Sequence, residues 1–155
     1  MNLKKTLAVT ATAIGLGMSI ITPAHASTGE ENQESPDACM KSQSASVFKY
    51  AIYFNSNYGG AYRNVGYPVY DFADERVGGS PQAGTQPLLF CHGGSGNNQG
   101  IKNNAASVRN KHSTYYAVTY YNSGYKGSSD WATPNSSRNL SQAYNQNASF
   151  NWSSL

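Results

Sequence analysis

The sequence contains few of the residues from which active sites are commonly built. Charged residues make up 12% of the 155 residues, and there are three histidines and two cysteines. No zinc-ligand spacing, phosphate-binding loop or Gly-x-Ser-x-Gly motif occurs. The acids Asp71, Asp74 and Glu75 are close in sequence but resemble a solvated turn more than an acid/base pair. These absences exclude the commonest hydrolytic and nucleotide-dependent chemistries, and we predict a protein that is not an enzyme and requires no cofactor.

Long apolar runs are lacking except near the N-terminus. Lys4 and Lys5 precede an apolar run over residues 7–21, which is followed by the small-x-small pattern of residues 24–26. A basic start, a short apolar core and this ending are typical of a secretory signal peptide, which we place at residues 1–26. The alternative, a retained membrane anchor, is disfavoured by the cleavage pattern and by the short run. We therefore expect a secreted, extracellular protein without a membrane partner after signal cleavage.

Positive charge is also scarce in the rest of the chain. Loss of the two N-terminal lysines lowers the formal net charge from +3 to +1. The remaining bases are scattered, whereas a nucleic-acid partner requires a basic patch or stripe, so we expect no nucleic-acid partner. Residues 27–46 are polar and acidic with one proline. This composition predicts a disordered acidic leader and linker.

The two cysteines, Cys39 and Cys91, are few enough to allow one intramolecular pairing. In an exported chain they are expected to form a disulfide, which would stabilise the fold by about 3 to 4 kcal/mol in the chain-entropy model. The adjacent pair Cys91 and His92 does not indicate a catalytic thiol, because neighbouring residues of an extended segment point to opposite faces.

The strongest positive feature is an internal repeat. The pattern aromatic-x-x-x-x-aromatic-x-Gly occurs at Tyr53, Tyr58 and Gly60 and again at Tyr120, Tyr125 and Gly127. Each copy follows a run rich in aromatic and β-branched residues, 48–54 and 115–121, which predicts a strand. The glycine lets the backbone turn with a positive φ while one ring packs over the bend. The alternative is two ordinary hairpins in a tyrosine-rich β domain.

A second pair of segments, 103–108 and 145–150, places asparagine, serine and an apolar residue at similar offsets. Together the two patterns resemble the βγ-crystallin Greek-key motif, two of which form one domain. Among secreted proteins with this fold, residues 47–152 are most similar to the microbial peptidase inhibitor family thirty-six, which includes a metalloproteinase inhibitor. The resemblance implies an all-β fold, with two Greek-key motifs forming a βγ-crystallin-like sandwich.

The two motifs are expected to differ in length. Motif one would cover residues 47–110 and motif two residues 111–152. Gly60 precedes Asn103 by 43 residues, whereas the corresponding spacing in motif two is 18. The difference predicts an insertion in motif one near residues 76–100, and long loops in compact domains are commonly functional or disordered.

The resemblance also implies calcium as a weakly bound ligand, because related domains bind it through two Asn or Asp residues, two variable residues and a serine. The matching residues are Asn103, Asn104 and Ser107 in motif one and Asn145, Gln146 and Ser149 in motif two, where Gln146 replaces the second Asn or Asp. Oxygen ligands without carboxylates predict an affinity of about 0.1 to 1 mM. The alternative is structural: the two serines bond turn backbone, with Val108 and Phe150 in the core.

Two classes of function follow as expectations. The resemblance implies an inhibitor of an extracellular peptidase, with a metalloprotease as the expected target. The alternative is a secreted structural or weakly calcium-binding βγ-crystallin module without an enzyme target. For the inhibitor, the glycine- and proline-rich loop carrying Leu88, Leu89 and Phe90 beside Cys91 is the expected protease contact, because a tethered loop loses less entropy on binding than a free peptide.

Overall fold

The computed structural model describes residues 28–76 and 84–154, so the predicted signal peptide lies outside the described residues. Within these two ranges no helix has the length and apolar character needed to cross a membrane. The elements in chain order are α1 Thr28–Glu34, α2 Pro36–Cys39, β1 Tyr50–Tyr53, the 3₁₀ turn η1 Ser56–Tyr58, β2 Tyr62–Val65, β3 Glu75–Arg76, β4 Thr85–Gln86, β5 Ser107–Asn110, β6 Tyr116–Asn122, β7 Lys126–Ala132, β8 Ser136–Asn139 and β9 Ser149–Ser153.

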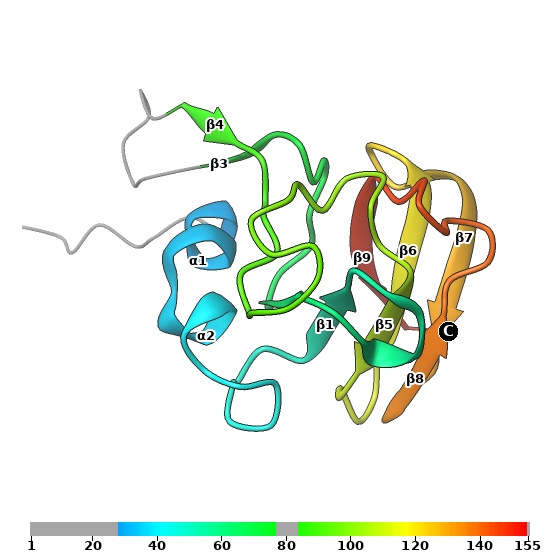
Figure 1. Cartoon of the computed structure of the whole chain (residues 1–155). Helices are drawn as coiled ribbons and strands as arrows, with labels where there is room; N and C mark the ends of the chain where they lie inside the picture. Colours follow the sequence, from blue (N-terminus) through cyan, green and yellow to red (C-terminus); the bar gives the residue numbers. More distant parts are fainter. Residues whose placement is uncertain (1–27, 77–83, 155) are drawn as a thin grey trace, which may run out of the picture.

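Two antiparallel sheets form the body of the protein (Figure 1). The larger sheet has the order β2-β1-β5-β8, the smaller sheet has the order β7-β6-β9, and β3 and β4 form a separate two-stranded ribbon. The predicted all-β sandwich is confirmed. The run predicted as a strand at 48–54 contains β1, and the run at 115–121 contains all of β6 except its last residue. These are the strands from which each aromatic repeat continues.

Each motif contributes a segment to the sheet of the other motif. β8 belongs to motif two but pairs with β5 in the larger sheet. Conversely, Val69 of motif one bonds to Phe150 of β9, with its N–H 2.8 Å from the Phe150 carbonyl and its carbonyl 2.9 Å from the Phe150 N–H. This exchange joins the two motifs along both sheets, so the chain folds as one sandwich and not as two separate halves.

The core lies between the two sheets and contains most of the large apolar side chains. The rings of Tyr50 and Phe150 stack with their centres 3.9 Å apart, and both side chains are fully buried. The Tyr50 hydroxyl lies 2.8 Å from Thr119 Oγ1, so its one polar atom is satisfied. Burial raises the pKa of Tyr50. The stacked pair fixes the larger sheet against the smaller one at the centre of the core.

The segment expected to be a disordered leader and linker is instead ordered over residues 28–46, and that prediction is wrong there. It forms α1 and α2, which lie beside the sandwich (Figure 1). α2 packs against the edge strand β2, and α1 packs against β3. The Arg63 guanidinium donates to the Asn32 and Gln33 carbonyls at 2.7 Å. Asn64 Nδ2 donates to the carbonyls of Asp37 and Lys41, at 3.0 Å each. The polar composition was misleading because these tertiary bonds satisfy the helix ends and cover a sheet edge.

The predicted insertion near residues 76–100 lies partly outside the described residues, at 77–83. Its described part does not form one loose loop. β4 pairs with β3, Leu88 and Phe90 enter the core, and a glycine-rich turn follows. That turn covers Phe54, since a Cβ on Gly96 would lie 2.2 Å from the Phe54 ring. The described part of the insertion therefore completes the core at one end of the sandwich.

Candidate functional site

The aromatic repeats form two equivalent corners. In motif one the Tyr53 and Tyr58 rings pack with centres 5.9 Å apart, and in motif two the Tyr120 and Tyr125 rings pack at 6.1 Å. Tyr58 and Tyr125 have φ values of 62° and 61°, while the following glycines, Gly60 and Gly127, have φ values of 71° and 80°. A Cβ at Gly127 would lie 2.8 Å from the Asn122 side chain. The repeated glycines are thus required by a close approach as well as by positive φ.

Ser107 and Ser149 support these corners in the same way. The Ser107 hydroxyl donates to the Asn55 carbonyl at 2.6 Å and accepts from the Tyr58 N–H at 3.0 Å. The Ser149 hydroxyl donates to the Asn122 carbonyl at 2.7 Å and accepts from the Tyr125 N–H at 3.0 Å. Val108 and Phe150 are fully buried. The two serines therefore have the structural role that was the alternative to calcium binding.

One predicted calcium residue from each motif, Asn103 and Gln146, lines a polar hollow of about 260 Å³ together with Asn122, Ser123 and their neighbours. Asn103 and Asn145 both adopt left-handed backbone, with φ values of 62° and 50°. Asn104 is turned aside, since its Nδ2 donates to the Gly100 carbonyl at 2.8 Å. Across residues 28–76 and 84–154, no three His, Cys, Asp or Glu side chains converge as metal ligands.

A lysine ammonium already reaches into this hollow. Lys102 Nζ lies 2.8 Å from Asp71 Oδ2 and 3.1 Å from Ser123 Oγ. Burial alone would raise the pKa of Asp71, but bonds from Lys102, the Ala73 amide and Ser123 outweigh it and leave the pKa lowered. The nearest carboxylate is therefore ionised and already paired with a cation. Calcium at the motif-two residues would have to compete with this ion pair, and calcium binding stays a prediction.

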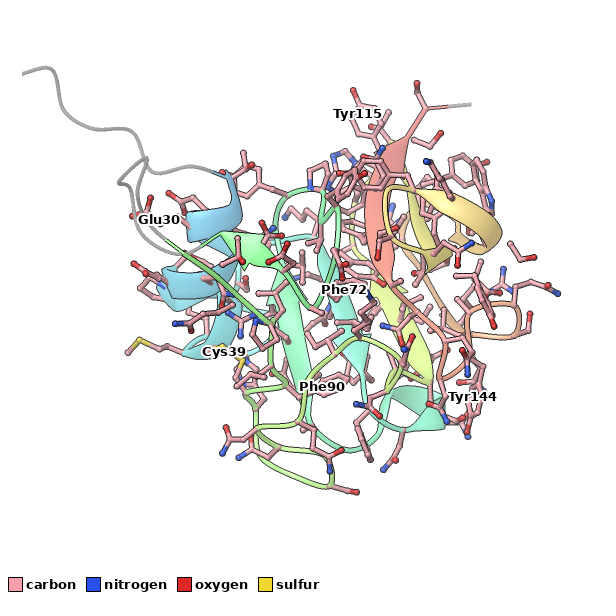
Figure 2. All side chains as sticks on the ribbon, turned by 90° about the horizontal axis from the view of Figure 1, so that it is seen from above. Glu30, Cys39, Phe72, Phe90, Tyr115 and Tyr144 are labelled. Atoms are coloured by element: carbon pink, nitrogen blue, oxygen red, sulfur yellow. A yellow bond between two sulfur atoms is a disulfide. The ribbon has the colours of Figure 1, made fainter. Side chains whose placement is uncertain are left out.

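Two of the three side chains expected to contact a protease are not available for that role. Leu88 and Phe90 are fully buried, and Figure 2 shows Phe90 in the interior of the molecule. Only Leu89 is exposed, at 36%. The Leu88 N–H donates to the Phe72 carbonyl at 2.8 Å, the Phe90 N–H to the Gln99 carbonyl at 2.9 Å, and the Leu89 carbonyl accepts from Arg63 at 2.9 Å. Alternation along an extended segment buries two of the three side chains, so the protease-contact prediction is wrong for Leu88 and Phe90.

The predicted disulfide is confirmed. Cys39 at the end of α2 is bonded to Cys91, with the two Cα atoms 5.5 Å apart. Because Cys91 is in this bond, it is not a thiol nucleophile for His92. The imidazole of His92 stacks on Tyr62, with ring centres 4.1 Å apart, and burial lowers its pKa. The disulfide fastens α2 to the segment that follows the core residue Phe90.

An aromatic cleft of about 470 Å³ opens at the junction of the two motifs. Its walls are Val47, Phe48, Lys49, Gly66, Tyr67, His112, Tyr115 and Trp152. We call this surface the junction cleft. The Phe48 and Tyr67 rings meet edge to face at 5.9 Å, and the His112 ring lies 4.7 Å from Tyr115 and 5.3 Å from Trp152. An apolar cleft of this volume with a few polar groups is the usual form of a binding site.

The junction cleft is held in shape by the connection between β5 and β6. The buried Asn110 side chain accepts from the His112 N–H at 2.8 Å and donates to the Tyr115 carbonyl at 2.8 Å. His112 Nδ1 accepts from the N–H groups of Thr114 and Tyr115, at 3.0 and 3.1 Å. Because Nδ1 is an acceptor, the neutral imidazole carries its proton on Nε2. Trp152 is fixed by a bond from its indole N–H to the Gly66 carbonyl, at 3.2 Å.

Sequence reasoning missed the junction cleft. It gave no functional role to His112, Tyr67 or Tyr115. The available signal was the occurrence of aromatic residues outside the repeated positions, at the end of one motif and the start of the next. Their convergence depends on the exchange of strands between the motifs, which the spacing of the repeats does not reveal.

Comparison with known proteins gives one structural similarity. A scan against protein-family models finds no match, and a search of curated proteins finds none either. Among solved structures, the chain is similar to one described as "Evolution of the eye lens beta-gamma-crystallin domain fold", with 15% sequence identity and a TM-score of 0.44 over 70% of this chain and 87% of that chain. The description of the fold therefore rests on the sheet order, the exchanged segments and the two paired corners.

Proposed function

We propose that the protein is a secreted, non-catalytic binding protein that inhibits an extracellular peptidase, with metalloproteases as the expected class. The choice of a peptidase as the target is inferred from the family resemblance of residues 47–152. The observation that carries a binding role is the junction cleft. It exposes aromatic and apolar side chains that a monomeric domain does not need at its surface, with Val47 63% exposed, Tyr115 43% and Tyr67 37%.

The chemistry of the junction cleft suits a protein partner. Tyrosine and tryptophan are enriched among the residues that dominate protein–protein affinity, because they bury a large area at little entropic cost and retain a polar group. The cleft is preformed by the Asn110 and Trp152 hydrogen bonds, so little ordering is required on binding. An extended segment of the peptidase surface would occupy it, with the Lys49 ammonium at the rim.

This arrangement supports inhibition in which the bound protein sterically blocks substrates from reaching the enzyme. Insertion of a substrate-like loop at residues 88–90 is disfavoured, since the Leu88 and Phe90 side chains are buried and their N–H groups are bonded within the fold. A partner bound at the junction cleft would instead be covered by the surrounding face of the sandwich, which blocks access of substrates to the enzyme. Inhibition should then be stronger for large protein substrates than for short peptides.

The test is a titration of the mature protein, residues 27–155, against a thermolysin-like metalloprotease and a subtilisin-like serine protease. The variant Tyr115→Ala should weaken inhibition of the target enzyme at least about tenfold, as expected for an interface aromatic. Tyr144→Ala is the matched control, because Tyr144 is similarly exposed at 46% but lies far from Tyr115 (Figure 2).

Two results would contradict the proposal. If neither protease class is inhibited at micromolar concentration, a peptidase is not the target. Equal inhibition by the wild type, the Tyr115 variant and the Tyr144 variant would instead leave an inhibitor whose contact surface lies elsewhere.

A secreted structural module without an enzyme target is the second candidate. It is favoured by the use of the Ser107 and Ser149 hydroxyls in both corners.

Weak calcium binding belongs to this candidate. We expect 10 mM calcium, about ten times the upper limit of the predicted dissociation constants, to raise the melting temperature of Lys102→Ala more than that of the wild type, because the substitution frees the Asp71 carboxylate. An equal shift in both proteins would place any calcium away from Lys102.

A further inference from the structure

A second pocket lies next to the junction cleft and has the opposite character. It has a volume of about 440 Å³ and is lined by Ser44, Ser46, Lys49, Arg109, Asn110, Lys111 and Asn135. Three of these residues are cations and none is a carboxylate. We call it the cationic pocket. Lys49 lines both the cationic pocket and the junction cleft.

The register of the larger sheet brings the three cations together. Arg109 of β5 is paired with Ala51 of β1, and just beyond the strand ends the Lys111 N–H donates to the Lys49 carbonyl at 2.7 Å. Tyr50 and Ile52 of β1 point into the core, so Lys49 and Ala51 lie on the opposite face of the sheet. On that face Lys49 and Arg109 are exposed, whereas Ala51 is covered. Like charges directly opposite each other across a sheet destabilise it. The sheet therefore holds positive charges in an unfavourable arrangement.

Neighbouring carboxylates do not neutralise this pocket. Within residues 28–76 and 84–154, the lysines and arginine that form ion pairs are Lys41, Lys102 and Arg138, with N to O distances of 3.0, 2.8 and 2.9 Å. None of the three pocket cations pairs in this way with a carboxylate of the described chain. Burial lowers the pKa of Lys111. The positive charges of Lys49 and Arg109 lower this pKa further, and the charge of Asp37 acts in the opposite direction. Lys49 and Arg109 thus act on the Lys111 ammonium as neighbouring positive charges.

One of the cations is held in position. The Lys111 ammonium donates to the carbonyls of Gln43 and Ser46, the latter at 3.1 Å. Burial raises the pKa of Tyr53, and the nearby Arg109 guanidinium opposes this rise. An ammonium has three N–H groups and a guanidinium has five, so both retain donors for a ligand. Arg109 in particular can offer two parallel N–H groups to an oxyanion.

We propose that the cationic pocket binds an oxyanion carrying two negative charges, a phosphate or sulfate group, between Lys49, Arg109 and Lys111. The ligand replaces the missing carboxylates, relieves the repulsion between the three cations and accepts charge-assisted hydrogen bonds from each. Its second substituent, where it has one, extends toward the junction cleft past Lys49. This site does not depend on the peptidase proposal, because its ligand is defined by charge alone.

The test is a calorimetric titration of the mature protein with sodium phosphate and with sodium sulfate, at constant ionic strength set with sodium chloride. We expect one binding site, with Arg109→Gln weakening the affinity about tenfold or more, because hydrogen bonds between charged partners are among the strongest in proteins. Lys126→Gln is the matched control. It removes the same charge from an exposed position on β7 in the other sheet and should leave the affinity unchanged.

The source of the oxyanion is separated by a second arm. Vesicles of phosphatidylcholine with phosphatidic acid present the same phosphate group on a lipid surface. Binding to these vesicles that Arg109→Gln abolishes assigns the site to a lipid headgroup, whereas phosphate binding without vesicle binding assigns it to a soluble or polymer-borne group.

Chemical-shift mapping of the wild type keeps the test independent of the variants' folding. Phosphate should move the backbone amide signals of Lys49, Arg109 and Lys111 together and saturably. The proposal is overturned by the absence of saturable phosphate and sulfate binding, by an equal loss of affinity in Arg109→Gln and Lys126→Gln, or by shifts located on other residues.

Discussion

The two motifs are nearly identical at their corners and differ in how the chain is fastened after them. Both corners have packed tyrosines, a glycine at positive φ and a serine hydroxyl that bonds the turn. In motif one, the long connection is fastened by the Cys39–Cys91 disulfide and by Arg63. In motif two, the short connection is fastened by the buried carboxylate of Asp130. The shared parts build the fold, and the parts that differ set how each connection is held to it.

This division has a physical reason. A corner is a local structure whose backbone φ values and hydrogen bonds are set by a few neighbouring residues, so both copies need the same side chains. A connection is constrained only to end where the next strand begins, so it accommodates changes in length and chemistry. The junction cleft and the cationic pocket lie where motif one meets motif two, and neither has a counterpart produced by the repeat.

The largest effect on the free energy of unfolding is expected from Asp130, which holds the connection of motif two in place. Asp130 is 1% exposed and accepts from the N–H groups of Ser141 and Ala143, each at 2.9 Å, and its side chain pairs with Arg138 at 2.9 Å. Asp130→Ala should lower the free energy of unfolding by about 4 kcal/mol, because it leaves buried donors without an acceptor. Urea denaturation measures it, with the exposed Asp74→Ala as control. A loss below about 1 kcal/mol would show that the motif-two connection is held by other contacts.

The corresponding fastening in motif one is covalent. Replacing both Cys39 and Cys91 with alanine should lower the free energy of unfolding by about 3 to 4 kcal/mol, as expected for a bridge between residues 52 positions apart. The loss should also expose α1 and α2 to amide hydrogen exchange, since the disulfide fastens α2. Unchanged exchange in the helices would show that Arg63 and Asn64 suffice to hold them.

A smaller and equal effect is expected at the two corners. Ser107→Ala and Ser149→Ala each remove one hydroxyl that makes two hydrogen bonds, so each should lower the free energy of unfolding by about 1 to 3 kcal/mol. The comparison is sharpened by measuring both variants under identical urea conditions. Values that differ by more than about 1 kcal/mol would show that the corners are not energetically equivalent.

The smallest effect is expected in how the stability of the protein depends on pH, through Asp37 of the N-terminal helix α2. The Val47 amide and Lys41 lower the pKa of Asp37 in the folded protein. A carboxyl with a lowered pKa stabilises the fold fully above its unfolded pKa, and this contribution is lost as the pH falls through the lower, folded value. Asp37→Asn should therefore lose less stability than the wild type between pH 6 and pH 3, limits chosen roughly on either side of the ordinary aspartate value. An identical loss in both proteins would remove Asp37 as a source of the dependence.

The corners were predictable from sequence because a corner leaves a fixed spacing of tyrosine, glycine and serine. Tyr53, Tyr58 and Gly60 therefore indicated a turn geometry that the structure confirms. The disulfide was predictable because the sequence has two cysteines, which allow one intramolecular pairing.

The tertiary features were not predictable in the same way. Residues 28–46 have the composition of a disordered segment, and their order depends on bonds to Arg63 and Asn64 more than 20 positions away. Leu88 and Phe90 were expected in a loop because glycine and proline surround them, yet they fill one end of the core. The junction cleft was not anticipated because its walls come from both motifs and meet only after the strands are exchanged.

The most direct test of the central claim, that this protein binds a peptidase through the junction cleft and not through residues 88–90, is amide chemical-shift mapping. The isotopically labelled mature protein is titrated with an inactivated thermolysin-like metalloprotease. Our account predicts changes at Phe48, Tyr67 and Tyr115, with Leu89 and the exposed Tyr144 unaffected. Changes confined to residues 88–90, or no change at any concentration that the assay reaches, would contradict it.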